Sequence, residues 1–338
     1  MLSRIAESLF WIGRYLERAD GTARLLDVHL QLLLEDPWVE EDIACRALLG
    51  VMGSEGPDER EMTRFDLLET LGVDRQNPAS IAFSLNQARE NARRAREAIS
   101  SEMWEVLNTN RARMPRKVSA EKIHQFFGWV RDRSALAVGT MESSTIRDET
   151  WSFFTLGRSL ERADMTARLL STRAFMDVGG PSWTTILRSC GAYEAYLRRY
   201  RGMPSAENAA EFLVLDRLFP RSILFQLLRA EDSIREIEPR IERPGSTNEL
   251  LRQLGQVRSD IEYQPIDAML HDLPSHMDTI QERMSDLSES LRQRYFPVLS
   301  APQWIRENVC PGCAFDTRRP SVTRRTFLPP ITRCACAR

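Results

Sequence analysis

The sequence lacks the features of secreted and membrane proteins. No apolar run approaches the roughly 18 residues that a membrane span needs. Charges at Arg4, Glu7 and Arg14 interrupt the first apolar stretch, which argues against a secretory signal peptide. Alternating runs of β-branched residues are nearly missing, so strands are not expected. These absences predict a cytoplasmic, all-α protein.

Recognisable catalytic and metal-binding motifs are missing as well. No glycine-rich phosphate loop follows a strand, and no Ser or Cys has an obvious base partner. The four histidines are scattered, and His271 and His276 stand five apart across Pro274, which is poor spacing for metal ligands. We predict no metal and no cofactor, assign no catalytic residue, and leave open whether the chain is an enzyme.

Cysteine is scarce, with six residues in the chain. Cys45 and Cys190 lie in apolar helical stretches and are predicted to be reduced core residues. The other four lie near the C-terminus, at Cys310, Cys313, Cys334 and Cys336. Because the second pair lacks the usual two-residue gap of a zinc site, we favour a flexible, Arg- and Pro-rich tail over residues 298–338.

Charge is nearly balanced over the whole chain but uneven along it. The net charge of the 338 residues is -2. Seven arginines against two acidic residues give residues 301–338 a charge of +5, so residues 1–300 carry -7. We therefore expect no whole-protein attraction to nucleic acid and no membrane partner. The 42% of hydrophobic residues is enough for a sizeable core.

Apolar residues recur at i, i+3, i+4 and i+7 through most of the chain, which predicts helix after helix. Asn77 is predicted to cap a helix whose first turn holds Pro78. Glycine- and proline-rich breaks are predicted at residues 36–37, 53–59, 179–181 and 243–248. The predicted helices cover residues 2–34, 41–52, 78–109, 119–141, 145–176, 182–200, 207–218, 220–242, 246–261 and 276–296.

One stretch of fourteen residues occurs twice. GRYLERADGTARLL (13–26) and GRSLERADMTARLL (157–170) are identical at twelve positions. A second match at nearly the same offset pairs PASIAF (78–83) with PRSILF (220–225). We interpret the pair of matches as a tandem duplication of a multi-helix unit with pseudo-twofold symmetry. The predicted organisation is a first repeat over 1–143, a second over 144–297 and the tail over 298–338.

The repeated helix separates its apolar and charged residues onto two arcs. The charged arc recurs without any exchange of Arg for Lys or Glu for Asp. Its members are Arg14, Glu17, Arg18, Asp20 and Arg24, and in the second copy Arg158, Glu161, Arg162, Asp164 and Arg168. Three interpretations are open: a solvated face, a buried ion network, or a binding site formed by both faces. We expect the two Glu-Arg pairs to line one shared, partly buried polar region.

A third charged stretch, QARENARRARE, covers residues 87–97. Arg89, Arg93 and Arg96 are spaced for one face of a helix, which is typical of an ordinary solvated face. If this face converged with the two Glu-Arg helices, its planar guanidinium groups would suit carboxylate or phosphate recognition.

Several segments resemble the bacterial alpha-E domain family: the two LERAD segments, ARENAR (88–93), STIRDETW (144–151), RSCGAYEAYLRRYRG (188–202) and FPRSILF (219–225). The resemblance covers about residues 1–297. It implies an all-helical domain encoded beside, or fused to, an ATP-grasp amidoligase-like protein and a transglutaminase-like peptidase. It further implies a role in making or modifying a peptide.

By this resemblance, Glu17-Arg18 and Glu161-Arg162 are the motif pairs. The other matching segments contribute Arg89, Glu90, Asn91, Arg147, Asp148, Glu194 and Arg221. Together with Arg14, Arg93 and Arg158, these residues are our candidates for an anion- or partner-binding site.

Three functions are consistent with the sequence. The first is an accessory or binding component of the ATP-grasp and transglutaminase-like system, with an acidic peptide or phosphate as ligand. The second is an enzyme of that pathway with Glu17 or Glu161 as catalyst, although arginine neighbours would hold these carboxylates ionised. The third is a structural helical bundle that acts by dimerising.

Overall fold

The computed structural model describes residues 1–35, 40–56, 60–174, 182–238 and 248–297. Within these residues all regular structure is helical, and no strand occurs. The prediction of an all-α fold is therefore confirmed. None of the described helices is long and apolar enough to cross a membrane. The predicted tail with its four cysteines lies outside the described residues.

The chain forms fourteen α-helices, one π-helix and two 3-10 helices over its described residues. The first are α1 (Ser3–Glu35), α2 (Glu41–Val51), α3 (Arg64–Leu67), η1 (Leu68–Val73), α4 (Ile81–Arg94), α5 (Ser101–Arg113), η2 (Ala120–Lys122) and α6 (Ile123–Ser144). There follow α7 (Glu149–Ser171), η3 (Thr172–Ala174), α8 (Trp183–Ser189), α9 (Tyr193–Tyr200), α10 (Ala206–Leu215), α11 (Ile223–Ile237), α12 (Glu249–Glu262), α13 (Ile266–His271) and α14 (Leu273–Tyr295).

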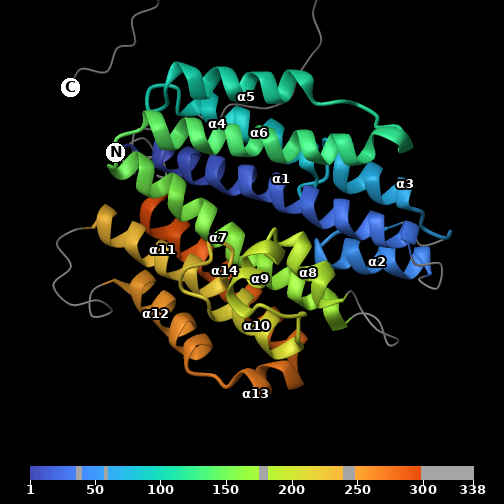
Figure 1. Cartoon of the computed structure of the whole chain (residues 1–338). Helices are drawn as coiled ribbons and strands as arrows, with labels where there is room; N and C mark the ends of the chain where they lie inside the picture. Colours follow the sequence, from blue (N-terminus) through green and yellow to red (C-terminus); the bar gives the residue numbers. More distant parts are fainter. Residues whose placement is uncertain (36–39, 57–59, 175–181, 239–247, 298–338) are drawn as a thin grey trace, which may run out of the picture. The chain divides into compact units, whose positions relative to one another are not determined.

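Helices α1 and α7 lie side by side at the centre of this arrangement (Figure 1). Helices α4 and α6 pack on α1, and α5 covers both of them. Helices α11 and α14 pack on α7, and α12 covers both of them. The two repeated stretches of sequence are therefore the two central helices, each with its own set of neighbours.

The second pair of matching segments also forms matching local structure. The hydroxyl of Ser80 accepts from the amide of Phe83 at 3.0 Å and caps α4, and Ser222 accepts from Phe225 at 3.1 Å and caps α11. Serine is favoured at this position because its oxygen satisfies an amide that the first helical turn leaves unpaired. The prediction that Asn77 caps the helix is wrong: Asn77 stabilises the preceding turn, and the helix begins after Ser80.

Two predicted helices are each divided in the structure. The helix expected over 78–109 ends at Arg94, and Ser100 caps a new helix, α5. The helix expected over 182–200 is broken at Gly191, whose φ of 62° is left-handed and unfavourable for other residues. The short helices α3, η1 and α13 were not predicted, because they lack a repeated apolar pattern.

Helix α7 is buried around almost its whole circumference. This burial explains why its charged arc is not a solvated face, since α1, α11 and α14 enclose it. The predicted apolar arc of α1 lies in the core, with Leu9, Ile12 and Leu16 fully enclosed. Cys45 and Cys190 are buried free cysteines, as predicted, and burial raises the pKa of both thiols to about 12.

Candidate functional site

Helices α1 and α7 touch backbone to backbone at two glycines. A Cβ placed on Gly13 would lie 2.2 Å from the carbonyl oxygen of Phe154. A Cβ placed on Gly157 would lie 2.0 Å from the carbonyl oxygen of Phe10. Any side chain at either position would force the helices apart. The glycines therefore set the helix separation and bring the residues one turn further along face to face.

One turn beyond this contact, each helix presents a glutamate to an arginine of the other. Arg162 donates from Nε and Nη2 to the two carboxylate oxygens of Glu17, each at 2.6 Å. Arg18 donates from the same two nitrogens to Glu161, at 2.5 Å and 3.1 Å. Both pairs are forks, the geometry in which guanidinium and carboxylate bind most strongly. The four motif residues thus lie together in one shared polar region.

A second arginine of each helix approaches the same carboxylates, but the two approaches differ. Arg14 donates from Nε to Glu161 at 2.6 Å and from Nη1 to Ser288 of α14 at 2.7 Å. The Nε atom of Arg158 lies 3.7 Å from Glu17 and is buried without a hydrogen-bond partner. Glu161 therefore holds its second arginine more closely than Glu17 does.

An aspartate–arginine pair continues the network on each helix. Arg24 donates to Asp20 at 2.9 Å, and Arg168 donates to Asp164 at 2.7 Å. Both pairs are spaced i,i+4, so each side chain is aligned by its own helix. Both aspartates are 6% exposed, whereas the side chains of Arg24 and Arg168 are partly exposed, so each pair joins a buried carboxylate to the edge of the network.

Arg221 joins the network from outside the two central helices. It lies just before α11 and donates to Glu17 at 3.1 Å and to Asp20 at 2.5 Å. In the matching segment before α4, the corresponding residue is Ala79. The network thus has an arginine beside Glu17 that has no counterpart beside Glu161.

The buried carboxylates of the motif are held ionised. Glu17 is 3% exposed and Glu161 is fully buried. Burial alone would raise the pKa of Glu161, but Arg18 and Arg14 outweigh this effect and lower it to about 2. Burial opposes ionisation of Glu17 in the same way, yet Arg162 and Arg221 hold its pKa well below its usual range. Neither carboxyl can act as a proton donor near neutral pH.

The structure places the predicted residues of α4 away from this network. Arg89 donates to Glu90 at 2.6 Å and stacks over Trp104, and Arg93 donates to Glu90 at 3.1 Å. The amide of Asn91 donates to a carbonyl of its own helix. These side chains bind one another and α5, so the structure does not bring them to the Glu-Arg helices.

The remaining predicted residues also lie apart from the network. Asp148 caps α7 by accepting from the amide of Thr150 at 2.9 Å. Arg147 lies with its guanidinium 3.6 Å from the ring centre of Trp151. Glu194 is exposed on α9. Asp148 caps a helix, and this structural role accounts for its presence in the STIRDETW segment without any need for a bound ligand.

Two cavities adjoin the network on the Glu161 side. The larger, which we call the α14 cavity, has a volume of about 340 Å³ and lies between α1, α7 and α14. The smaller, which we call the Ala79 cavity, has a volume of about 210 Å³. Arg18, Asp164 and Arg168 line both of them. The Glu-Arg network is therefore accessible from this side.

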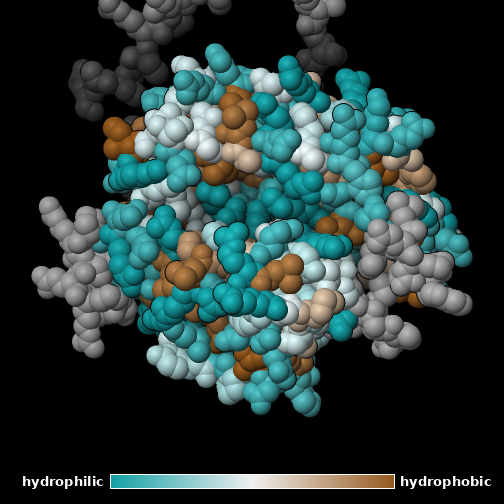
Figure 2. All heavy atoms as spheres, viewed as in Figure 1, coloured by the Kyte–Doolittle hydropathy of each residue, from teal (hydrophilic) through white to brown (hydrophobic). Residues whose placement is uncertain are grey.

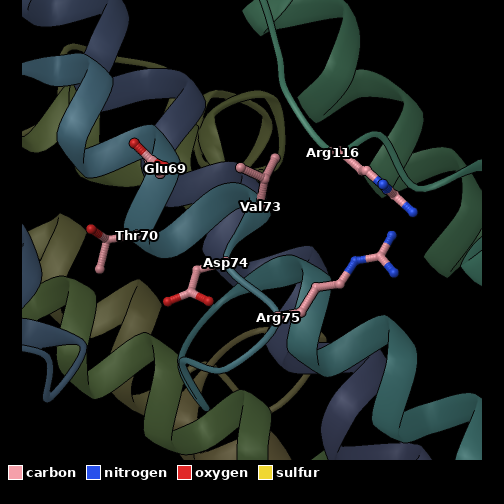
Figure 3. Close-up of a pocket in the computed structure, with 6 residues that line it drawn as sticks. All are labelled: Glu69, Thr70, Val73, Asp74, Arg75 and Arg116. Atoms are coloured by element: carbon pink, nitrogen blue, oxygen red, sulfur yellow. The ribbon is translucent and has the colours of Figure 1, made fainter.

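A third cavity, of about 700 Å³, lies beside η1 and uses none of these residues. Figure 3 shows Arg75 and Arg116 entering it from different segments, with their guanidinium groups pointing toward one another. Glu69 and Asp74 line it as well, so its charges balance. Both arginines are exposed, in contrast to the enclosed arginines of the α1–α7 contact.

Sequence reasoning missed three contributors to the site. Gly13 and Gly157 create the helix contact, and their signal was present: glycine, a poor helix former, opens both copies of the repeat. The contact of Ser288 of α14 with Arg14 could not be predicted, because nothing in the local sequence links these two residues.

The described residues define a class of all-α protein with two central helices. In this class the buried glutamate of each central helix binds an arginine of the other. The chain belongs to the Alpha-E family, described as a predicted alpha-helical domain with a conserved ER motif, whose model matches residues 1–296. No group of three or more His, Cys, Asp or Glu side chains in the described part of the chain could hold a metal ion.

The chain is also similar to longer mycobacterial proteins. It is 25% identical over 272 residues to an uncharacterized protein of Mycobacterium bovis and, equally, to uncharacterized proteins of two Mycobacterium tuberculosis strains. These matches cover 72% of this chain and 30% of each relative, so the chain spans about a third of their length. No solved structure matches the chain.

Proposed function

We propose that this protein is the binding component of a peptide-synthesis or peptide-modification system, in which it works with an ATP-grasp-type protein and a transglutaminase-like protein. In this proposal, the α14 cavity binds an acidic group, either a carboxylate of a peptide or a phosphate. The observation that carries the proposal is the charge of the lining: four arginines face two acidic residues. These are Arg14, Arg18, Arg168, Arg292, Asp164 and Glu289.

The arginines of this cavity are already oriented by buried partners. Glu161 fixes Arg14 and Arg18, and Asp164 fixes Arg168. A ligand would therefore lose little affinity to the ordering of these side chains. Arg292 stands at the rim, half exposed and paired with Glu289, where an incoming anion can compete for it. Guanidinium groups held in fixed positions favour ligands with two adjacent oxygens.

We also propose that residues 1–143 and 144–297 arose by tandem duplication. The reciprocal forks of Glu17 and Glu161 support this origin, as do the matching serine caps of α4 and α11. Two further contacts match: Arg18 donates to the carbonyl of Pro78, and Arg162 donates to that of Pro220.

The two alternatives from the sequence receive less support. A Glu17 or Glu161 that transfers protons in catalysis would need a pKa nearer neutral pH, and the low pKa values of both carboxyls oppose this role. A dimerising bundle would need a continuous hydrophobic face. Figure 2 shows one face of the molecule, where hydrophobic side chains are scattered among hydrophilic ones.

Calorimetric titration tests the binding proposal. The full chain is titrated with inorganic phosphate, ATP and a tri-glutamate peptide. Arg292→Ala removes the rim arginine without touching the buried network, and should weaken binding about tenfold through loss of one charged hydrogen bond. Co-purification with the ATP-grasp-type and transglutaminase-like proteins tests the partners.

Arg252→Ala is the matched control. Arg252 pairs with Glu249 on α12 in the same i,i+3 geometry, with a glutamine next in sequence, and has similar exposure. The control should bind as the unaltered chain does. Equal binding by the Arg292→Ala and unaltered chains, or no binding of any of the three anions, would refute the proposal.

A further inference from the structure

We propose that the Ala79 cavity is a binding site for an alkylguanidinium group, held by Asp164 in the way that Asp20 holds Arg221. This inference concerns a second site and a ligand group of opposite charge, so it does not depend on the anion proposal. It rests on a comparison of the two sides of the α1–α7 contact.

The Glu17 side shows how such a group is held. The carbonyl of Pro220 accepts from Arg162, and Ser222 caps α11. Between them, Arg221 extends its side chain into the network and donates to Asp20 and Glu17. A guanidinium from outside the central helices is therefore part of the network on this side.

The Glu161 side has the same backbone arrangement with a shorter side chain. The carbonyl of Pro78 accepts from Arg18, and Ser80 caps α4. Ala79 lies between Pro78 and Ser80 and lines the Ala79 cavity. Glu161 and Asp164, the counterparts of the two carboxylates that Arg221 binds on the Glu17 side, both line this cavity.

Asp164 is the natural anchor for the ligand. It is 6% exposed and accepts from Arg168, whereas its counterpart Asp20 accepts from both Arg24 and Arg221. A buried carboxylate is most stable when several donors satisfy its oxygens. A guanidinium in the cavity would supply the donor that Arg221 supplies to Asp20.

The cavity also fits the group in size and in the character of its walls. Met165, which stands where the other copy has Gly21, lines the cavity, and the volume of the cavity is about 210 Å³. This volume holds several waters at about 30 Å³ each, so a planar guanidinium has room. Met52, Pro78 and Met165 provide apolar surface for an alkyl stem.

The charges that face the cavity permit a cation. Arg18 and Arg168 line it together with Glu161 and Asp164, so the lining is neutral before a ligand enters. Glu161 is already occupied by Arg14 and Arg18, which leaves Asp164 as the acceptor for the new group. The ligand class is therefore an alkylguanidinium, as in the side chain of an arginine-containing peptide.

Calorimetric titration of the full chain with n-butylguanidinium chloride tests the site, with n-butylurea as a neutral ligand of the same shape. We expect one site for the cation and binding of the urea at least about tenfold weaker. Ala79→Arg, which places a tethered guanidinium in the cavity, should abolish binding, and Ala79→Leu should weaken it about tenfold or more. Arg292→Ala, which alters only the α14 cavity, should leave it unchanged.

Arg221→Ala provides a second, independent readout. It opens the corresponding space on the Glu17 side, so n-butylguanidinium should raise the Tm of this variant more than that of the unaltered chain. The inference is wrong if the unaltered chain binds n-butylurea as tightly as n-butylguanidinium. It is also wrong if Ala79→Arg and Ala79→Leu both fold and bind as the unaltered chain does, or if the Tm of Arg221→Ala does not respond.

Discussion

The Glu17 side and the Glu161 side of the α1–α7 contact are built from nearly identical sequence, yet they differ in structure. On the Glu17 side Arg221 enters the network, and Arg158 is left 3.7 Å from the carboxylate. On the Glu161 side no arginine enters from position 79, and Arg14 binds the carboxylate at 2.6 Å.

This difference shows that residues outside the motif decide which groups surround each glutamate. Arg221 adds a positive charge beside Arg158, and burial together with Arg162 lowers the pKa of Arg158 to about 10. Ser288 of α14 instead supports Arg14 on the other side. On the Glu17 side Arg221 joins the network from outside the motif, and on the Glu161 side Arg18, Asp164 and Arg168 line two cavities.

The largest expected effect comes from neutralising either glutamate. Glu161→Gln or Glu17→Gln would leave buried arginines without their counter-ion, and each should lower the free energy of unfolding by about 3–5 kcal/mol. Urea denaturation followed by circular dichroism measures this loss. Glu289→Gln, at a half-exposed surface pair, should leave the free energy of unfolding nearly unchanged. Similar losses of unfolding free energy for Glu17→Gln, Glu161→Gln and Glu289→Gln would contradict the expectation that the buried pairs matter more to stability than an exposed one.

The free energy of unfolding should also depend on pH through the ion pairs of Glu161. The folded pKa of Glu161 is about 2, below the unfolded value of about 4.3, so its contribution is present above pH 4.3 and is lost as the pH falls toward 2. The contribution amounts to about 3 kcal/mol. The stability of Glu161→Gln should therefore decline less steeply between pH 5 and pH 2 than that of the unaltered chain. Parallel declines would contradict this assignment.

A smaller effect is expected at the helix contact shared by the two sides. Gly157→Ala places a Cβ against the carbonyl of Phe10, and repacking should cost about 1–3 kcal/mol. Gly139→Ala, in α6 with open space around it, should instead stabilise by up to about 1 kcal/mol through helix propensity. Thermal denaturation distinguishes them, and a stabilising Gly157→Ala would show that the helices do not touch there.

The smallest expected effect is the difference in stability between substitutions of Arg14 and of Arg158, the second arginine beside each glutamate. Arg14→Met removes a bond to Glu161 and one to Ser288, whereas Arg158→Met removes a longer ion pair and an unpaired buried Nε. We expect Arg14→Met to cost about 1 kcal/mol more, the value of a typical hydrogen bond. Equal costs in urea denaturation would remove the distinction between the sides.

Much of the fold was predictable because it depends on local patterns. The apolar period predicted the long helices, and the doubled LERAD stretch singled out α1 and α7 as two helices of matching sequence. The short helices α3 and α13 were missed, since a few residues cannot show a period. The break at Gly191 depends on a left-handed backbone that the flanking apolar residues do not reveal.

The site was predictable only in part. Exact retention of Glu17, Arg18 and their copies pointed to a shared polar region, because a solvated face would tolerate exchanges of like charge. The partners Ser288 and Arg221 lie far away in sequence, and only the packing of α14 and α11 on α7 brings them near. For the arginines of α4 the sequence left a solvated face and a binding role both open, because charge spacing shows which residues share a face but not which way the face points.

The titration of Glu17 and Glu161 tests most directly whether the Glu-Arg motif is an ionised, buried crosslink. The full chain is labelled with ¹³C-glutamate, and the Cδ resonances, assigned with the two glutamine variants, are followed from pH 7 to pH 3. We predict that both resonances keep their ionised positions throughout, while ordinary exposed glutamates titrate near about pH 4.3. A midpoint above pH 5 for either carboxyl would contradict the account and support a role in proton transfer.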